Sequence, residues 1–127
     1  MFFKYIIFII LISSSIFANS FKTNIFIKCD QNKDNHLNKK EYAKMSLKRF
    51  ERFDISKDNQ VDPKELSQTQ LAKLMPQIAI NWFIRNDINQ NKIVTKQEAI
   101  NASNIKFKTL DKNKDNLLDI KEWIGNL

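Results

Sequence analysis

The chain has 127 residues, of which 43% are hydrophobic and 11% aromatic. This length and composition exclude a disordered chain and predict one compact domain with a single core. With only one glycine and two prolines, few turns are glycine-driven, which argues against a β-sandwich or barrel and favours helices. The formal charge is +7, but the lysines are scattered, so we interpret it as a solvated surface and not as a nucleic-acid site.

Residues 1–20 predict a secretory signal peptide. A short basic start precedes unbroken apolar sequence at residues 5–12, and Ala18 and Ser20 are small residues suited to cleavage. Because the apolar run is about half of the ~20 residues that span a bilayer, we favour cleavage over a retained membrane anchor. The predicted mature domain, residues 21–127, is then periplasmic or secreted, and cleavage after Ala18 or after Ser20 stays open.

Four twelve-residue segments repeat along the rest of the chain. They cover residues 30–41, 54–65, 87–98 and 111–122, here called the first to fourth loops. Each begins with Asp, ends with Glu, carries oxygen-bearing side chains at positions 3, 5 and 9, and has an aliphatic residue at position 8. A phenylalanine stands four residues before each loop, on the apolar face of a predicted entering helix. The repeat therefore predicts four polar turns held between apolar helix faces.

The spacing of the loops predicts the helices that connect them. We expect helices near residues 21–30, 39–53, 63–74, 77–87, 96–110 and 119–126. Only twelve residues separate the first loop from the second and the third from the fourth. Each of those two connections is therefore expected to be one helix that serves as the exit of one loop and the entry of the next. Pro76 is expected to start a helix after a short break.

The loops and their flanking residues resemble the EF-hand superfamily, over residues 21–127. The 24-residue step from the first loop to the second resembles small exported bacterial EF-hand proteins. The resemblance implies an all-α fold of four helix-loop-helix units that share helices, with short β contacts at position 8 between paired loops. Straight shared helices would pair the second loop with the third and the first with the fourth. Bent ones would pair the first with the second and the third with the fourth, and both pairings stay open.

The resemblance implies that the loops bind calcium ions, Ca²⁺, which takes six to eight oxygen ligands. Side chains at positions 1, 3, 5, 9 and 12 and the backbone carbonyl at position 7 supply them. The implied ligands are Asp30, Asn32, Asp34, His36, Asn38, Glu41, Asp54, Ser56, Asp58, Gln60, Asp62, Glu65, Asp87, Asn89, Asn91, Ile93, Thr95, Glu98, Asp111, Asn113, Asp115, Leu117, Asp119 and Glu122.

The loops differ in the residue types that set affinity. Position 6, normally glycine in the family, is Asn35, Asn59, Lys92 or Asn116. Asparagine tolerates the left-handed backbone that this turn requires, whereas lysine there costs about 1 kcal/mol. The second and fourth loops carry four acidic ligands each, the first loop three and the third loop two. We predict that the second and fourth loops bind calcium most tightly, the first loop next, and the third weakly or not at all.

The function that we expect is calcium binding in an exported protein, as a buffer or as a calcium-dependent interaction module with a protein partner. The alternative is a calcium-stabilised binder of an anionic membrane surface or cell-surface polymer, because the mature chain, which lacks Lys4, still carries +6. We expect no enzyme, since one His, one Cys and one Gly give neither a nucleophile–base pair nor a phosphate loop. Cys29 is expected to be a small buried hydrophobe, although a link between chains leaves the oligomeric state open.

Overall fold

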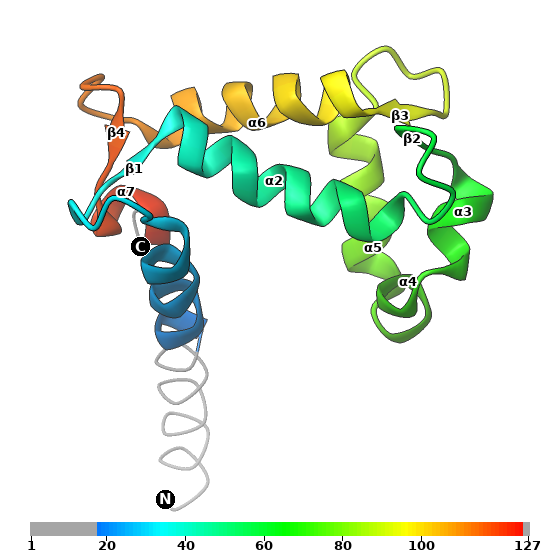
Figure 1. The fold of residues 1–127 in the computed structure, drawn as a ribbon, viewed down its shortest axis with the longest axis horizontal. Coiled ribbons are helices and arrows are strands. Elements are labelled where there is room, and N and C mark those ends of the chain that lie inside the picture. The colour runs from blue at the N-terminus through cyan, green and yellow to red at the C-terminus, as the bar shows by residue number, and fades with distance from the viewer. Residues whose placement is uncertain (1–17, 126–127) are drawn as a thin grey trace, which may run out of the picture.

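The computed structural model describes residues 18–125 of the chain. Residues 18–29 are helical. The elements that follow are β1 (Leu37–Asn38), α2 (Lys39–Phe53), β2 (Gln60–Val61), α3 (Pro63–Gln68), α4 (Gln70–Leu74), α5 (Pro76–Asn86), β3 (Val94–Thr95), α6 (Lys96–Leu110), β4 (Leu117–Leu118) and α7 (Ile120–Ile124). The predicted all-α fold with short β contacts is confirmed (Figure 1). Residues 1–17, most of the predicted signal peptide, lie outside the described residues.

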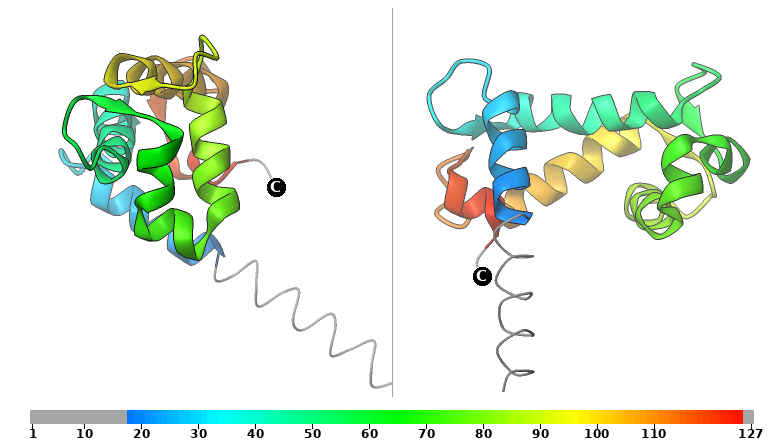
Figure 2. Two further views of the ribbon diagram at one scale, coloured as in Figure 1. Left: turned by 90° about the vertical axis from the view of Figure 1, so that its right-hand side faces the viewer. Right: turned by 90° about the horizontal axis from the view of Figure 1, so that it is seen from below.

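Two long helices, α2 and α6, lie side by side and join two lobes (Figures 1 and 2). Within residues 18–125, no other pair of elements packs together as extensively. One lobe holds residues 18–29, β1, β4 and α7, and the other holds β2, β3, α3, α4 and α5. Each long helix has 15 residues, or about 22 Å at 1.5 Å per residue, which keeps the loops at its two ends apart.

The strand pairs show which loops are neighbours. β1 pairs antiparallel with β4, placing Leu37 opposite Leu118, and β2 pairs antiparallel with β3, placing Val61 opposite Val94. The first loop therefore pairs with the fourth, and the second with the third. This is the arrangement that straight shared helices require, and it follows from the lengths of α2 and α6 running between the lobes.

The prediction of a single core is wrong, because each lobe has its own. The core between the second and third loops consists of Phe50, Phe53, Val61, Leu66, Ala79, Trp82, Val94 and Ala99. The core between the first and fourth loops consists of Phe26, Leu37, Tyr42, Phe107 and Leu118, with Cys29 and Trp123 packed partly buried against it. The physical reason is that straight shared helices hold the two loop pairs at opposite ends, so their apolar faces cannot merge. Cys29 is half-buried and not fully buried.

The helix predicted over residues 63–74 is interrupted. α3 ends at Gln68 and α4 begins at Gln70, because Thr69 adopts an extended backbone with φ −69° and ψ 149°. The Thr69 hydroxyl donates to the Leu66 carbonyl at 2.7 Å and accepts from the Ala72 amide at 3.2 Å, which caps α4. Pro76 begins α5 as predicted. Among the described helices, none is both long and apolar enough to cross a bilayer.

Candidate metal centres

All four loops turn through two residues with a left-handed backbone. Position 6 has φ between 62° and 67°, as predicted, and position 4 has φ between 59° and 61°. The residues are Lys33, Asn35, Lys57, Asn59, Gln90, Lys92, Lys114 and Asn116. Each left-handed Lys or Gln costs roughly 1–2 kcal/mol, so other interactions within the loop must offset this strain. The position-4 turn was missed, because nothing in a lysine or glutamine signals a positive φ.

The aspartate at position 1 supplies part of that offset. In the second loop, the Asp54 carboxylate accepts hydrogen bonds from the backbone amides of Asp58, at 3.2 Å, and Asn59, at 3.1 Å. The first and third loops make the same two bonds, and the fourth keeps only the bond from position 6. The position-1 carboxylate therefore sits inside the turn, where backbone amides hold it in place.

The closing glutamate at position 12 points back across the loop. Glu122 Oε1 accepts from the amides of Lys112, at 2.9 Å, and Asn113, at 3.3 Å, and its Oε2 accepts from the Asp119 amide at 3.2 Å. The first loop repeats these three bonds. This geometry brings both ends of each loop together around a shared space.

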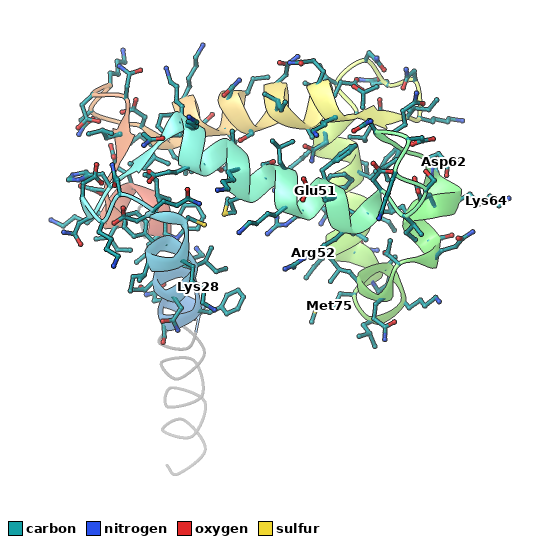
Figure 3. All side chains as sticks on the ribbon, viewed as in Figure 1. Lys28, Glu51, Arg52, Asp62, Lys64 and Met75 are labelled. Carbon is teal, nitrogen blue, oxygen red and sulfur yellow. The ribbon has the colours of Figure 1, made fainter. Side chains whose placement is uncertain are left out.

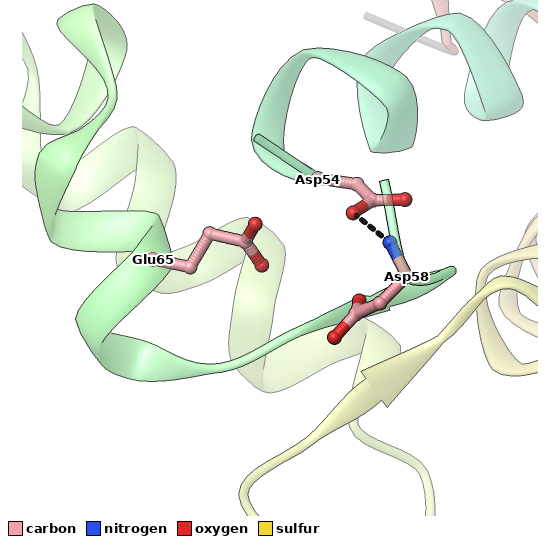
Figure 4. A group of neighbouring side chains, drawn as sticks. All are labelled: Asp54, Asp58 and Glu65. Carbon is pink, nitrogen blue, oxygen red and sulfur yellow. Dashed lines mark hydrogen bonds between the residues drawn. The ribbon is translucent and has the colours of Figure 1, made fainter. Parts of the chain in front are cut away.

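The second loop differs, because its glutamate is less occupied by the protein. Glu65 accepts from the Ser56 amide at 2.6 Å, and within residues 18–125 the capping box that forms in the other three loops is absent here. Oxygens of Asp54, Asp58 and Glu65 lie within 4.8 Å of one another, and Figure 4 shows the three carboxylates around a common space. It is the one such group in the described part of the chain. Ser56, Gln60 and Asp62 also line this hollow, of about 330 Å³.

Three carboxylates this close repel one another. At 4.8 Å each pair costs between about 1 kcal/mol in water and about 3 kcal/mol at an effective dielectric of 20. Asp54 is buried, whereas Asp58 is exposed, so the cost lies between these limits. A divalent cation among the three oxygens would turn the repulsion into attraction, and carboxylate oxygens are the ligands that hard cations prefer.

The fourth loop contains an acceptor that the protein leaves unsatisfied. Asp111 Oδ1 is buried and has no hydrogen-bond partner, while Oδ2 accepts from the Asn116 amide at 3.1 Å. A buried carboxylate oxygen without a partner is costly. Asp111 occupies position 1, where the family pattern places a metal ligand, so this donor set fits a cation as well.

The third loop satisfies its glutamate with protein donors. Burial alone would raise the pKa of Glu98, but hydrogen bonds from the Thr95 amide and hydroxyl and from the Asn89 and Ile88 amides together lower it. The Thr95 amide and hydroxyl each lie 2.9 Å from Oε2. Glu98 is therefore ionised and held in place without a cation, in the loop with fewest acidic ligands.

The side chains at position 9 have a role that the ligand pattern alone did not reveal. They are the N-caps of the helices that leave the loops, and each accepts from the backbone amide of the closing glutamate. They are Asn38, Asp62, Thr95 and Asp119. The signal was present in the sequence as a Ser, Thr, Asp or Asn followed three residues later by Glu. Position 9 thus fixes the glutamate at the start of the exit helix.

The other predicted ligands also lie along the inner turn. In the first and fourth loops the position-3 amide groups of Asn32 and Asn113 donate to the position-5 carboxylates, at 2.7 and 2.9 Å. His36 Nδ1 lies 2.9 Å from the Asp34 carbonyl oxygen, so its ring is engaged locally, as expected where only the backbone carbonyl is needed. The position-5 side chains accept from the position-7 amides in all four loops.

Comparison with known families matches two parts of the chain. A family model described as EF hand matches residues 47–69 and 105–125. These ranges contain the second and fourth loops, each with the end of its entering helix and the start of its exit helix. A search of curated proteins gave no match. The two matched loops are the ones with four acidic ligands each. The second contains the carboxylate cluster, and the fourth contains the unsatisfied Asp111 oxygen.

Proposed function

Because the chain belongs to the EF-hand superfamily, we propose that it is an exported protein that binds calcium ions in four loops. EF hands imply calcium binding, and the donor set suits Ca²⁺, which accepts six to eight oxygens in a flexible cage. Magnesium demands a rigid octahedron and keeps several waters, so these loops should bind it more weakly. When bound, calcium would supply the positive charge that the clustered carboxylates lack.

The observation that carries the proposal is the carboxylate cluster of the second loop. Asp54, Asp58 and Glu65 already converge within 4.8 Å, so little rearrangement is needed to surround an ion. We assign the strongest binding to this loop and to the fourth, where Asp111 Oδ1 awaits a partner. The first loop follows, and the third binds weakly or not at all, because it carries only two acidic ligands and has Lys92 at position 6.

Isothermal titration of the protein with calcium and then with magnesium tests this assignment. We expect at least two calcium sites, with dissociation constants as weak as roughly 10⁻⁴ to 10⁻³ M, as in extracellular modules. Glu65→Gln and Glu122→Gln should each remove one of the tighter sites. Glu51→Gln, which changes an exposed glutamate outside the loops, is the matched control. No calcium uptake at millimolar concentration would overturn the proposal.

The cellular role that we propose is buffering or a calcium-dependent contact with a protein partner, with no catalytic step. Sensor EF hands open on binding and expose a methionine-rich groove, whereas residues 21–127 contain only Met45 and Met75. Buffering is therefore the simpler role. An apolar-surface dye added during a calcium titration distinguishes the two: a rise in dye fluorescence would favour the interaction module, and no response would favour the buffer.

Export is supported by the sequence of residues 1–20 and is tested on the processed protein. We expect a mature N-terminus after Ala18 or Ser20, found by mass spectrometry of protein outside the cytosol. Lys22 Nζ donates to the Ile124 carbonyl oxygen at 2.9 Å, and Trp123 Nε1 donates to the Lys22 carbonyl oxygen at 2.9 Å. Both contacts survive either cut. An intact Met1 in a purely cytosolic protein would contradict export.

A further inference from the structure

The corner between α4 and α5 exposes large apolar side chains. Leu74 is 73% exposed, Met75 53% and Ile78 50%, and along α5 Ile80 is 43% exposed and Ile84 66%. Single exposed apolar residues are ordinary, but a group gathered on one corner marks a contact surface. Leu74, Met75 and Ile78, which lie around the turn, are called the corner patch below, whereas Ile80 and Ile84 line an apolar hollow on another side of α5.

The corner patch is separate from the residues that build the lobe. On α5, Ala79, Trp82 and Asn86 are buried, and their spacing of three and four places them on one helix face. Leu74, Met75 and Ile78 belong neither to this buried face nor to the core of the lobe. Their exposure is therefore not a consequence of core packing.

The patch lies in a stretch of chain without negative charge. Residues 66–86 contain no Asp or Glu but include Lys73 and Arg85, and both side chains are exposed. In the view of Figure 3, Met75 lies on the lower side of this lobe, whereas Asp62 lies towards its outer edge. The surface around the corner is thus apolar and basic, which complements an apolar partner with a negatively charged border.

We propose that this corner docks onto the surface of an anionic lipid bilayer. Leu74, Met75 and Ile78 enter the boundary between headgroups and acyl chains, while Lys73 and Arg85 contact lipid phosphates. None of the described helices could cross a bilayer, so the contact is peripheral. The inference goes beyond calcium binding, because it concerns helices α4 and α5 and not the loops.

A bilayer fits the corner better than a soluble helix does. An apolar hollow of about 350 Å³ lies between α3 and α5, and its lining includes Leu66, Ala79, Ile80, Phe83 and Ile84. A peptide helix would bind by filling such a hollow. Leu74, Met75 and Ile78 do not line it; they project at the corner itself, where a flat, deformable surface can surround them.

The test places an environment-sensitive fluorophore at the corner. In a Cys29→Ser background, Met75→Cys carries the label, and Ile105→Cys carries it in a matched control, since Ile105 is 59% exposed on α6. The labelled full chains are mixed with vesicles of phosphatidylcholine alone or with one quarter phosphatidylglycerol. We expect a blue shift at position 75 with the anionic vesicles only, and a smaller one or none at position 105. Because the probe is local, attachment through residues 1–20 would not imitate this pattern.

Pairs of substitutions then separate the contribution of charge to vesicle binding from that of apolar contacts. Each basic residue near an anionic surface strengthens binding about fivefold, so Lys73→Glu with Arg85→Glu should weaken binding at least tenfold. Lys106→Glu with Lys108→Glu, the same charge change on α6, should weaken it much less. Leu74→Ser with Ile78→Ser should weaken binding at both low and high salt. All variants are first checked for an unchanged helical spectrum and an unchanged calcium titration. Vesicle binding is then measured both in calcium and in chelator, so that a loss of calcium binding is distinguished from a loss of membrane binding.

Several results would overturn the proposal. These are no shift at position 75 with anionic vesicles, an equal shift at position 105, or vesicle binding unaffected by the Leu74→Ser and Ile78→Ser pair. A shift at position 75 caused by an acidic helical peptide but not by vesicles would assign the surface to a protein partner. A shift that appears without lipid as protein concentration rises would assign it to a second copy of the chain.

Discussion

Val61 and Val94 face each other across the antiparallel pairing of β2 and β3, and both side chains are fully buried. This contact joins the loop with four acidic ligands to the loop with two. A further backbone bond, from the Lys96 amide to the Asn59 carbonyl oxygen at 3.1 Å, links the same two loops. The third loop therefore supports the geometry of the second, whatever its own affinity for calcium.

Truncating that contact should weaken both folding and ion binding. Val94→Ala removes two buried methyl groups at a site that packs tightly, and we expect a loss of about 1–2 kcal/mol in the free energy of unfolding, measured by urea in chelator. Calcium binding in the second loop should weaken as well, although Val94 lies in the third. Ile105→Ala, at a residue 59% exposed on α6 and outside the loops, is the control. A variant that lost stability but kept its tightest calcium site unchanged would show that the loops act independently.

Glu98 should make the stability of the metal-free protein depend on acid pH. Its folded pKa is lowered below the ordinary 4.5, by hydrogen bonds that outweigh the effect of burial. A lowered carboxyl pKa stabilises the folded state above the unfolded pKa, and this contribution is lost as the pH falls through the folded pKa. We expect the urea midpoint of unfolding, measured in chelator, to decrease as the pH is lowered below about 4.5. The Glu98→Gln protein should be less stable at neutral pH, and its urea midpoint should decrease less as the pH is lowered. Parallel pH profiles for the two proteins would contradict this role.

Much of the fold was predictable because the loops recur at fixed spacing. The bounds of α2 and α6 follow from the twelve residues between loops, and the strand positions follow from the aliphatic residue at position 8. The pairing of loops did not follow, since it depends on whether α2 bends, and no local residue pattern reports a straight helix. The break at Thr69 was missed for a related reason: a threonine within a helical stretch either continues the helix or caps the next one, and the choice depends on tertiary contacts.

The candidate sites were predictable in their residue types but not in their state. The implied ligands come from the family pattern, whereas the difference between a converged second loop and a self-satisfied third loop depends on which donors reach Glu65 and Glu98. Thr95 alone supplies two of the hydrogen bonds to Glu98. The order of affinities that the acidic counts suggest stays a prediction until calcium binding is measured.

Cys29 should react slowly with thiol reagents in the folded protein. Burial raises the pKa of its thiol from the ordinary 9.0, an effect that Lys48 partly opposes and Glu41 reinforces. The protonated thiol, which is unreactive, is favoured, so this contribution to stability is present at neutral pH and lost as the pH rises through the raised pKa. We expect alkylation at pH 7 to be much slower in the native state than in urea, followed by mass spectrometry. Equal rates in both states would show that the thiol is open to solvent.

Each lobe contains one tryptophan, and the pair can report whether the lobes unfold together. Trp82 packs against Phe53 with ring centroids 4.4 Å apart, and Trp123 packs edge-on against Tyr42 at 5.9 Å. Because α2 and α6 supply buried residues to both cores, neither core can lose its helices without exposing the other. Trp123→Phe leaves Trp82 as the sole reporter of one lobe, and Trp82→Phe leaves Trp123 for the other. We expect coincident urea transitions by both probes.

The coupling can be tested with a cavity in the opposite lobe. Phe107 is fully buried near Trp123 in the core between the first and fourth loops, and Phe107→Ala should cost about 3–5 kcal/mol. If the shared helices make the two cores one cooperative unit, this substitution shifts the Trp82 transition as far as the Trp123 transition. A shift confined to Trp123 would mean that α2 and α6 can fray at one end while the carboxylate cluster of the second loop stays folded at the other. The two lobes would then bind calcium as separate units.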